Sequence, residues 1–544
     1  MSLDLNVSRS EYGEGPMAMA LSTDRGPLPI TAWFDIGSCR QVERLSESLD
    51  VNLRGRRLRI EHCKRFVLRT WGAMAAMRFA QGQERIERMD AAFDADSAGN
   101  VQLERLLLRA TDAALDDDCE TAVRLVSDAL EAYEGASSHP VASLLLRLGH
   151  WKARRLEAFC EFSRSVDRVP AGRREALLRI LHLSMESAVE AEQLRITTAG
   201  RLAHEALELS ARVFGADFPG GRMAATLSAS ILYEHDHIDA ADRLIRDRLA
   251  LSGAQGGIEG ALRAYVVGAR IAVARQQVPF AVLLLREAEL LGKQRGWHRL
   301  IAISLAERVR LLVEDGRMLE AEECAERLAM MPTKTGSSIN DGILAREIVL
   351  SRARLELAHA ASASTASSLR RIVAECLTRR ECHRAVELQL LLACTLLELG
   401  RDDEATTEAV SAIERGAIAG LYRTFLDGGE ATRHLLGWLF ERRVGDAGVL
   451  GELRPYVRNL LIGFPERTKQ AATARTRHRS GESLSPRERH ILGLISHGLS
   501  NKRIAKELDI APETVKSHAK HILLKLAAQT RVEAVSRALS LGMI

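Results

Sequence analysis

The sequence predicts an all-α protein made of an α-solenoid body and a smaller, separate C-terminal domain of short helices. Three observations predict this fold class. Aromatic residues are only 4% of the chain while Ala, Leu, Arg and Glu dominate, which favours helices. Helical periodicity begins near Arg57 and continues for about 370 residues, and its later part repeats about every 40 residues. A chain of 544 residues is long enough for two to four domains with cores of their own.

Residues 1–56 form an N-terminal segment that we expect to be partly mobile, because it is rich in Gly, Ser and charged residues. The run from Pro29 to Phe34 fits a short strand or an extended arm on the helices, and the pattern does not decide between them. No secretory signal is visible, and no apolar run approaches the roughly 20 residues that cross a bilayer. We therefore expect a soluble, cytoplasmic protein without a membrane partner.

Residues 57–230 read as a region of irregular helical hairpins. Helical patterns there include Val123 to Tyr133 and Val141 to Phe162. Asp116, Asp117 and Asp118 precede a helix that starts near Glu120. Negative charge stabilises the N-terminus of a helix, so this run favours a cap over a cation site.

Residues 231–463 show a clear repeat. Alanines near the start of each second helix fall at intervals of 40, 40, 42 and 42 residues, namely Ala241, Ala281, Ala321, Ala363 and Ala405. Gly316 and Gly400 each precede such an alanine by five residues, which predicts a Gly-containing turn between paired helices. Each pair would bury its apolar face on the next pair, giving an α-solenoid with a long concave surface.

Two clusters were weighed as metal sites. His235, Asp236 and His237 with Asp239 fall at a turn between two helices, where short polar residues are common, so a turn is the favoured interpretation. Cys376, Cys382 and His383 have no familiar zinc spacing. The eight cysteines are scattered without a Cys-x-x-Cys pair, which is typical of reduced thiols in a cytoplasmic protein. We expect no metal.

Residues 464–482 are rich in Thr, Ser and Arg and predict a flexible linker. Arg475, Arg477 and Arg479 either add non-specific attraction to phosphates or belong to a solvated tether. Residues 466–544 hold 15 Lys and Arg against 7 Asp and Glu, a net +8, so the other residues must carry −4 to reach the total of +4. A basic module on a mildly acidic body is typical of nucleic-acid binders.

Residues 483–544 form the predicted C-terminal domain, and three short helices can be placed between Leu484 and Leu526. Ser485, Pro486 and Glu488 form a capping box that begins the first helix. The second helix spans about Asn501 to Leu508, and the third begins at Pro512 after a tight turn.

The third helix has one apolar stripe, made of Val515, Ala519, Ile522 and Leu526 at spacings of four, three and four. The opposite face then carries polar and basic residues, namely Lys516, Ser517, Lys520, His521 and Lys525. Two short helices joined by a turn, the second one basic, are typical of a unit that inserts a helix into the DNA major groove.

The ordered motifs Leu-Ser-Pro-Arg-Glu, Gly-Leu-Ser-Asn-Lys, Thr-Val-Lys-x-His and Thr-Arg-x-Glu-Ala-Val resemble the LuxR-type helix-turn-helix. The resemblance implies a four-helix domain whose helix-turn-helix spans Asn501 to Lys520. It implies base contacts from Lys516, Ser517 and Lys520, beside His521. Phosphate contacts would come from Ser500, Asn501, Lys502 and Thr514, and dimer contacts from Val532, Val535 and Leu539. The alternative, a basic surface helix in an ordinary bundle, is disfavoured by so many ordered matches.

Two positions depart from that family pattern. Ala511 stands where the family usually has Ser or Thr, and the missing cap should cost roughly 1 kcal/mol of helix stability. Ala527 stands where the family usually has Gly, which adopts a left-handed helix end more readily.

Residues 230–463 resemble tetratricopeptide repeats, and Gly420 to Gly429 followed by His434 to Leu436 looks like the end of the sensor region of MalT-like LuxR regulators. Large members of that family carry an N-terminal ATPase. The sequence contains no G-x-x-x-x-G-K-[ST] loop, so we expect no ATPase, no enzyme activity and no cofactor.

Together the resemblances imply a DNA-binding transcriptional regulator, more often an activator than a repressor, whose repeats sense a signal. The implied partners are double-stranded DNA, a second copy of the chain on DNA, a small-molecule, peptide or protein effector at the repeats, and RNA polymerase for an activator. The alternative is a helical-repeat interaction scaffold with non-specific DNA tethering, and sequence specificity in DNA binding distinguishes the two.

Overall fold

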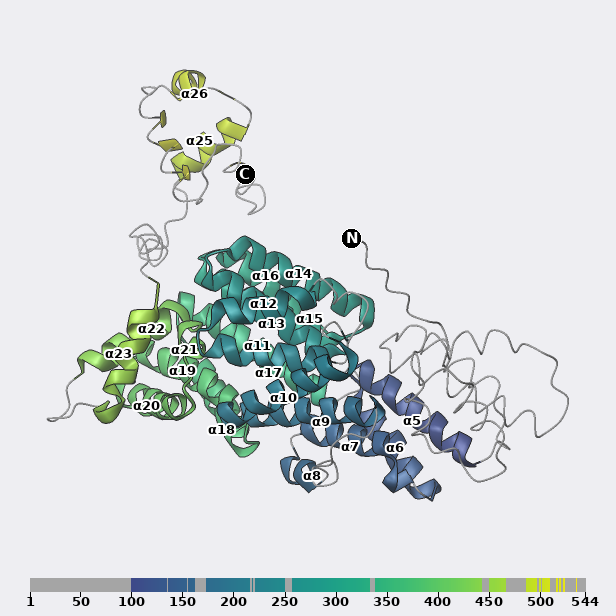
Figure 1. The fold of residues 1–544 in the computed structure, drawn as a ribbon. Coiled ribbons are helices and arrows are strands. Elements are labelled where there is room, and N and C mark those ends of the chain that lie inside the picture. Colours follow the sequence, from purple (N-terminus) through teal and green to yellow (C-terminus); the bar gives the residue numbers. More distant parts are fainter. Residues whose placement is uncertain are drawn as a thin grey trace, which may run out of the picture. The chain divides into compact units, whose positions relative to one another are not determined.

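The computed structural model describes residues 99–465, with gaps at 135, 154, 162–172, 216–217, 219–220, 250–256, 333–337 and 443–449. In the C-terminal domain it describes residues 486–496, 499, 501–508, 515, 516, 518, 519, 522, 523 and 535. Every regular element in these ranges is a helix, which confirms the all-α prediction (Figure 1). The chain divides into a body that ends at Phe464 and a second unit that begins at Pro465. The predicted strand or arm from Pro29 to Phe34 lies outside the described residues.

The body is a series of helical hairpins that stack on one another. Its helices are α5 (Gly99–Leu115), α6 (Cys119–Ala132), α7 (Pro140–Lys152), α8 (Leu156–Glu161), α9 (Arg173–Glu192), α10 (Ile196–Phe214), α11 (Arg222–Glu234), α12 (Ile238–Leu249), α13 (Ile258–Ala274), α14 (Val278–Arg295), α15 (His298–Glu314), α16 (Met318–Ala329), α17 (Ser338–His359), α18 (Ala363–Thr378), α19 (Cys382–Glu398), α20 (Asp402–Ala419), α21 (Arg423–Leu426), α22 (Gly429–Glu441) and α23 (Arg454–Gly463). First helices also contact the first helix of the next hairpin, as α13 contacts α15 and α15 contacts α17. This stacking is the α-solenoid that the repeat predicted.

One tight turn recurs between paired helices. The residue two positions before the second helix has a positive φ, as predicted for Gly316 (φ 78°) and Gly400 (φ 70°). The next N–H donates to a carbonyl five residues back, as from Arg317 to Leu312 at 2.8 Å. This is the Schellman geometry that closes a helix. Residues other than Gly take the same position at Asp117, Leu194, Asp236 and Gln276, and Arg380 takes it in the turn before α19, the first helix of its hairpin. Glycine therefore revealed only two of these turns in the sequence.

The alanine repeat marks the fourth residue of each second helix. Ala241, Ala281, Ala321 and Ala405 occupy that place in α12, α14, α16 and α20, and all are fully buried. Ala363 does lie at the start of the second helix α18, as predicted, but it is exposed there, and Ala366 is the buried fourth residue. The reason is the helix cap: the Ser362 hydroxyl accepts from the N–H of Thr365 at 3.2 Å, which starts α18 later than even spacing would require.

Two features near the start of the described body refine the predictions. The acidic cap is confirmed, because Asp118 caps α6 by accepting from the N–H of Thr121 at 3.0 Å. The helical pattern from Val141 to Phe162 contains two helices, α7 and α8. The Arg155 N–H donates back to the His150 carbonyl at 2.9 Å, which ends α7 and redirects the chain.

The largest core cluster among the described residues joins the C-terminal segments of the body to the earlier helix α10. It includes Leu421, Phe425, Leu435 and Val457 from the C-terminal segments and Ile196 from α10, all buried. Helix α9 contacts α19, and α11 contacts α21. The segments Gly420 to Gly429 and His434 to Leu436, called the sensor-end motif below, therefore pack in this core. The solenoid curves until its later helices meet α9 to α11.

Candidate functional site

The C-terminal unit contains the core that a helix-turn-helix requires. Its helices α25 (Pro486–Ser496) and α26 (Asn501–Glu507) pack around Ile491, Leu492, Ile504 and Ala505. Pro486 is the first residue of α25, as predicted. The apolar stripe of the third helix is confirmed at its three described positions, since Val515, Ala519 and Ile522 are 0%, 6% and 1% exposed. Leu526 lies outside the described residues.

The structure describes part of the predicted DNA-binding face. Lys516 is exposed directly beside buried Val515, as a groove-facing residue must be. Asn501 and Lys502 lie on α26, at its first two positions. The other predicted contacts lie outside the described residues: Ser500, Thr514, Ser517, Lys520 and His521. Their roles stay predictions.

The predicted dimer contact is described at one position. Val535 is partly buried against the core of its own domain, while Val532 and Leu539 lie outside the described residues. A residue that packs its own domain can still present an edge to a partner, so the dimer role of these three residues stays a prediction.

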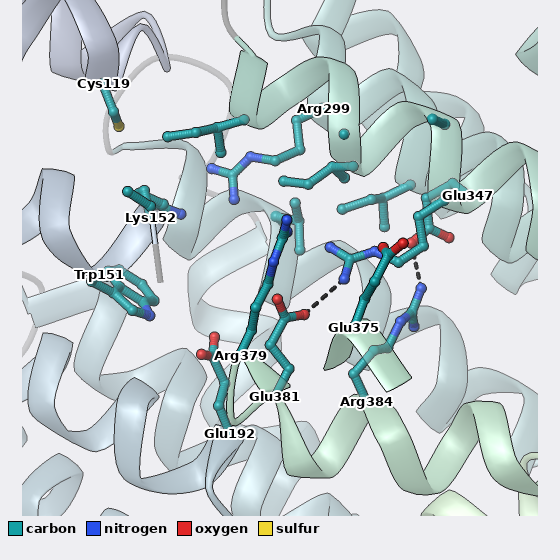
Figure 2. Close-up of a pocket in the computed structure, with 18 of the residues that line it drawn as sticks. Cys119, Trp151, Lys152, Glu192, Arg299, Glu347, Glu375, Arg379, Glu381 and Arg384 are labelled. Carbon is teal, nitrogen blue, oxygen red and sulfur yellow. Dashed lines mark hydrogen bonds and ion pairs between the residues drawn. The ribbon is translucent and has the colours of Figure 1, made fainter. Parts of the chain in front are cut away.

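The body contains a second candidate site, a charged cavity of about 1140 Å³ (Figure 2). Helices α6, α7, α9, α13, α15, α17, α18 and α19 line it. Eleven lining residues are Lys or Arg and eight are Glu, so the lining has three excess positive charges. Apolar side chains such as Trp151, Ile303, Ile343 and Val349 lie between the charged ones. The cavity can hold a ligand that has both charged and apolar parts.

One wall of the cavity is held by a buried ion cluster. Arg299 donates two hydrogen bonds to Asp117 at 2.9 and 2.7 Å, and their side chains are 7% and 5% exposed. Arg299 and Lys152 both pair with Glu259. Burial raises the pKa of the Glu259 carboxyl, but Arg299 and Lys152 outweigh it and hold that pKa well below its usual value. The cluster joins the α5–α6 turn to α7, α13 and α15.

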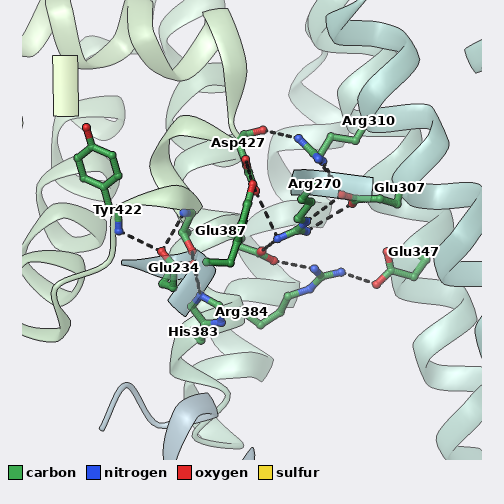
Figure 3. A network of polar contacts seen from close by, with 12 residues as sticks. Glu234, Arg270, Glu307, Arg310, Glu347, His383, Arg384, Glu387, Tyr422 and Asp427 are labelled. Atoms are coloured by element: carbon green, nitrogen blue, oxygen red, sulfur yellow. Dashed lines mark hydrogen bonds and ion pairs between the residues drawn. The ribbon is translucent and has the colours of Figure 1, made fainter. Parts of the chain in front are cut away.

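The other wall is an ion network that reaches the sensor-end motif (Figure 3). Glu307 accepts from Arg270 at 2.8 Å and from Arg310 at 2.7 Å. Arg310 also donates to the backbone carbonyl of Asp427 at 2.8 Å, and the Tyr233 hydroxyl donates to the Asp427 carboxylate at 2.8 Å. Burial raises the pKa of both Tyr233 and Asp427. The cavity wall and the segment after α20 are thus one hydrogen-bonded unit.

The N-terminus of α21 is docked by a single carboxylate. Glu234, at the end of α11, accepts the N–H of Tyr422 at 3.0 Å and that of Thr424 at 2.9 Å. His383 contacts the Thr424 hydroxyl at 2.9 Å. A carboxylate at unsatisfied N–H groups is the usual stabilising arrangement for a helix start.

Sequence reasoning missed these ion networks. Their partners lie on different helices, and the separations are about one repeat or longer: Arg270 and Glu307, Arg299 and Glu259, or Arg310 and Asp427. One signal was present in the sequence. Arg308 and Arg310 interrupt the apolar run of α15, and a charged residue at a core position requires a buried partner.

Side chains in the two clusters that resemble metal sites contact other protein groups. Asp236 accepts from Arg423 at 2.7 Å, and Asp239 accepts from Arg275 at 2.5 Å. Burial raises the pKa of the Cys376 thiol. In the part of the chain that is described, no three His, Cys, Asp or Glu side chains gather as a metal site would need, and no helix is long and apolar enough to span a membrane.

Comparison with known proteins identifies both parts of the chain. Residues 104–442 match the MalT-like TPR region, and this match covers more than half of the chain. The chain belongs to the MalT-like TPR family. Residues 482–538 match the bacterial regulatory proteins of the luxR family. Both resemblances inferred from the sequence are therefore confirmed, and the MalT-like match begins well before the repeat that was visible in the sequence.

Two curated relatives are named as regulators. The nitrate/nitrite response regulator protein NarL of Escherichia coli is 36% identical over 127 residues, which are 23% of this chain and 52% of NarL. The HTH-type transcriptional regulator MalT of Vibrio cholerae is 31% identical over 171 residues, 29% of this chain and 18% of MalT. The chain thus spans about half of NarL and a smaller share of MalT.

Among solved structures, the Rap protein complexed with Competence and Sporulation Factor resembles the MalT-like body. The TM-score is 0.50 at 11% sequence identity, over 66% of this chain and 99% of that one. At this identity the likeness shows a shared helical-repeat fold.

Proposed function

We propose that this protein is a sequence-specific DNA-binding transcriptional regulator, acting in the cytoplasm, whose MalT-like body receives a signal. The observation that carries the proposal is the luxR-family domain, with Val515, Ala519 and Ile522 buried and Lys516 exposed on the same helix. That arrangement presents a basic face to the major groove. We infer activation, the commoner outcome in the family, with RNA polymerase as a partner. No catalytic role is assigned to the body.

Specific binding requires residues that read bases and residues that hold phosphates. We assign base reading to Lys516, Ser517 and Lys520. We assign phosphate contacts to Ser500, Asn501, Lys502 and Thr514. Two copies of the domain would bind a two-fold site through the last helix, which carries Val535. Half-site spacing then follows from the dimer geometry.

The body is the proposed sensor, and the charged cavity is where a small molecule or peptide would bind. Its wall is hydrogen-bonded to Asp427 in the segment that leads to α22 and α23. NarL is described as responding to nitrate and nitrite, and the Rap protein is seen with a bound factor. These likenesses support a sensing body without identifying its ligand.

The decisive experiment is genome-wide DNA capture by the purified full-length protein at physiological salt, followed by sequencing. The regulator proposal predicts a recurring two-fold motif that Lys516→Ala no longer enriches. Retention without any motif, both with the full chain and with residues 465–544 alone, would favour the scaffold that merely tethers to DNA, because such attraction depends on salt and not on sequence.

A further inference from the structure

We propose that the cavity of the body binds a carboxylate-bearing effector and that Arg354 on α17 is the residue that binds its carboxylate. This inference rests on the proposed sensing role of the body. It names the chemistry of the ligand, which is carried either by a free organic acid or by a short peptide with a free C-terminus. Three observations lead to it: the pairing of the other arginines, the charge of the lining and the shape of the cavity.

Arg354 differs from the arginines around it. Arg270, Arg299, Arg346 and Arg384 line the same cavity, and each donates to a glutamate or aspartate. The partly buried Arg354 makes no hydrogen bond or ion pair in the described structure. A guanidinium has five N–H donors in a fork that matches a carboxylate, so an unpaired one that faces a cavity is suited to bind an anion.

The electrostatic surroundings of Arg354 support this assignment. Burial lowers the pKa of Arg354 to about 10, Arg310 and Arg384 lower it as well, and Glu307 and Glu347 only partly compensate. The protonated guanidinium is therefore destabilised in the folded body. A ligand carboxylate would supply a compensating negative charge, and its ion pair with a partly buried guanidinium is stronger than one at the exposed surface.

The composition of the lining selects a carboxylate over a more highly charged anion. Eight glutamates repel a dense negative charge, and the excess of basic residues is only three. Arg379 also lines the cavity (Figure 2), and its side chain makes no hydrogen bond or ion pair among the described residues. The volume of about 1140 Å³ slightly exceeds the roughly 300–1,000 Å³ of usual small-molecule pockets. A ligand with one or two carboxylates and an apolar skeleton fits these properties.

The position of Arg354 also links a ligand to the sensor-end motif. Arg354 interacts electrostatically with Glu307, whose carboxylate holds Arg270 and Arg310. Arg310 in turn holds the carbonyl of Asp427. A carboxylate on Arg354 changes the charge balance of the network that docks this segment, so binding and the position of the segment are coupled.

The test measures thermal unfolding of the full-length protein by tryptophan fluorescence. All five tryptophans precede residue 465, so the signal reports on the body and not on the DNA-binding domain. The probes are hexanedioate, which has two carboxylates on an apolar chain, and two pools of random pentapeptides, one with free and one with amidated C-termini, each compared with NaCl at equal ionic strength. A rise of the unfolding midpoint with hexanedioate identifies the organic acid as source, and a rise with the free but not the amidated pool identifies the peptide.

Two variants remove the site in different ways, and one serves as control. Arg354→Gln removes the charge, and the affinity for the active probe should fall about 10- to 100-fold, the loss expected for a hydrogen bond to a charged group. Gly342→Trp fills the cavity without changing charge, because a side chain at Gly342 on α17 meets no atom within 4 Å. Arg243→Gln removes an exposed arginine of α12 that does not line the cavity and should keep the response.

The proposal is overturned if no carboxylate probe raises the midpoint of thermal unfolding more than NaCl does. It is also overturned if the probe raises the midpoint of Arg354→Gln as much as that of the wild type. Because the readout is unfolding of the body, either result leaves the regulator proposal intact. Conversely, DNA capture without a motif would leave a carboxylate response of the body intact.

Discussion

The buried pair of Arg299 and Asp117 provides a quantitative test of how the start of the described body is joined to its middle. Asp117 lies in the α5–α6 turn with φ 67° and accepts two hydrogen bonds from Arg299. Asp117→Asn keeps the shape of the side chain and tolerates the left-handed backbone, so it removes mainly the charge. Arg299 retains Glu259. We expect a loss of about 1.5–3 kcal/mol in the free energy of unfolding, the contribution of a hydrogen bond to a charged group.

Asp117→Ala should destabilise the protein more. It removes both acceptors from a guanidinium that is 7% exposed, and breaking a buried pair from one side costs about 3–5 kcal/mol. The left-handed backbone at this position adds roughly 1 kcal/mol for a residue with an ordinary side chain. The two variants should therefore differ by at least about 1 kcal/mol.

The assay is urea unfolding followed by tryptophan fluorescence, and it is sensitive here because the Trp297 indole donates to the Leu115 carbonyl at 3.0 Å in the same joint. Asp118→Asn is the matched control. Asp118 caps α6, and Asn caps a helix as well as Asp does, so this variant should unfold like the wild type. Equal stability of Asp117→Asn and Asp118→Asn would show that the buried pair does not stabilise the joint, and the argument would be wrong.

Three further changes test other parts of the structure. Gly316→Ala should cost about 1 kcal/mol of unfolding free energy, and the cause would be backbone strain at φ 78°, since the added Cβ would meet nothing within 4 Å. Gly342→Ala, in the second turn of α17, should not destabilise the protein, and equal effects of the two changes in urea unfolding would contradict the turn assignment. Burial raises the pKa of Glu387, but Arg384 and Arg270 outweigh burial and lower that pKa to about 2. The contribution of the ionised Glu387 carboxylate to the free energy of unfolding is therefore present above pH 4.5 and is lost as pH falls toward 2. The free energy of unfolding of the wild type should exceed that of Glu387→Gln by up to about 3 kcal/mol at pH 6. This difference should shrink at pH 3, and a difference that stays constant with pH would refute the assignment. Lys516→Ala should weaken binding to the captured motif by about 1–3 kcal/mol, whereas Arg243→Gln should not change it; unchanged affinity in a gel-shift titration would exclude Lys516 from base reading.

The sequence by itself determined what depends on neighbouring residues. Periodicity identified the helices, Gly316 and Gly400 identified two turns, and the spacing of Val515, Ala519 and Ile522 identified the buried stripe. The ordered motifs of the last 55 or so residues identified the luxR-family domain, because such motifs keep a constant spacing. The even spacing did not identify the buried alanine of α18, because the Ser362 cap and not the repeat length sets where this helix begins.

Only the tertiary structure decided which charged residues meet. Arg354 and Arg384 are both arginines on first helices of their hairpins, yet Arg384 pairs with Glu347 and Glu387 while Arg354 faces the cavity unpaired. The angle at which each hairpin stacks on the next determines these pairings, and small changes of angle accumulate over several repeats. The approach of α11 to α21, which brings Tyr233 to Asp427 across 194 residues, has the same origin. Local pattern specifies each hairpin, but the curvature of the whole solenoid places the cavity and its ion networks.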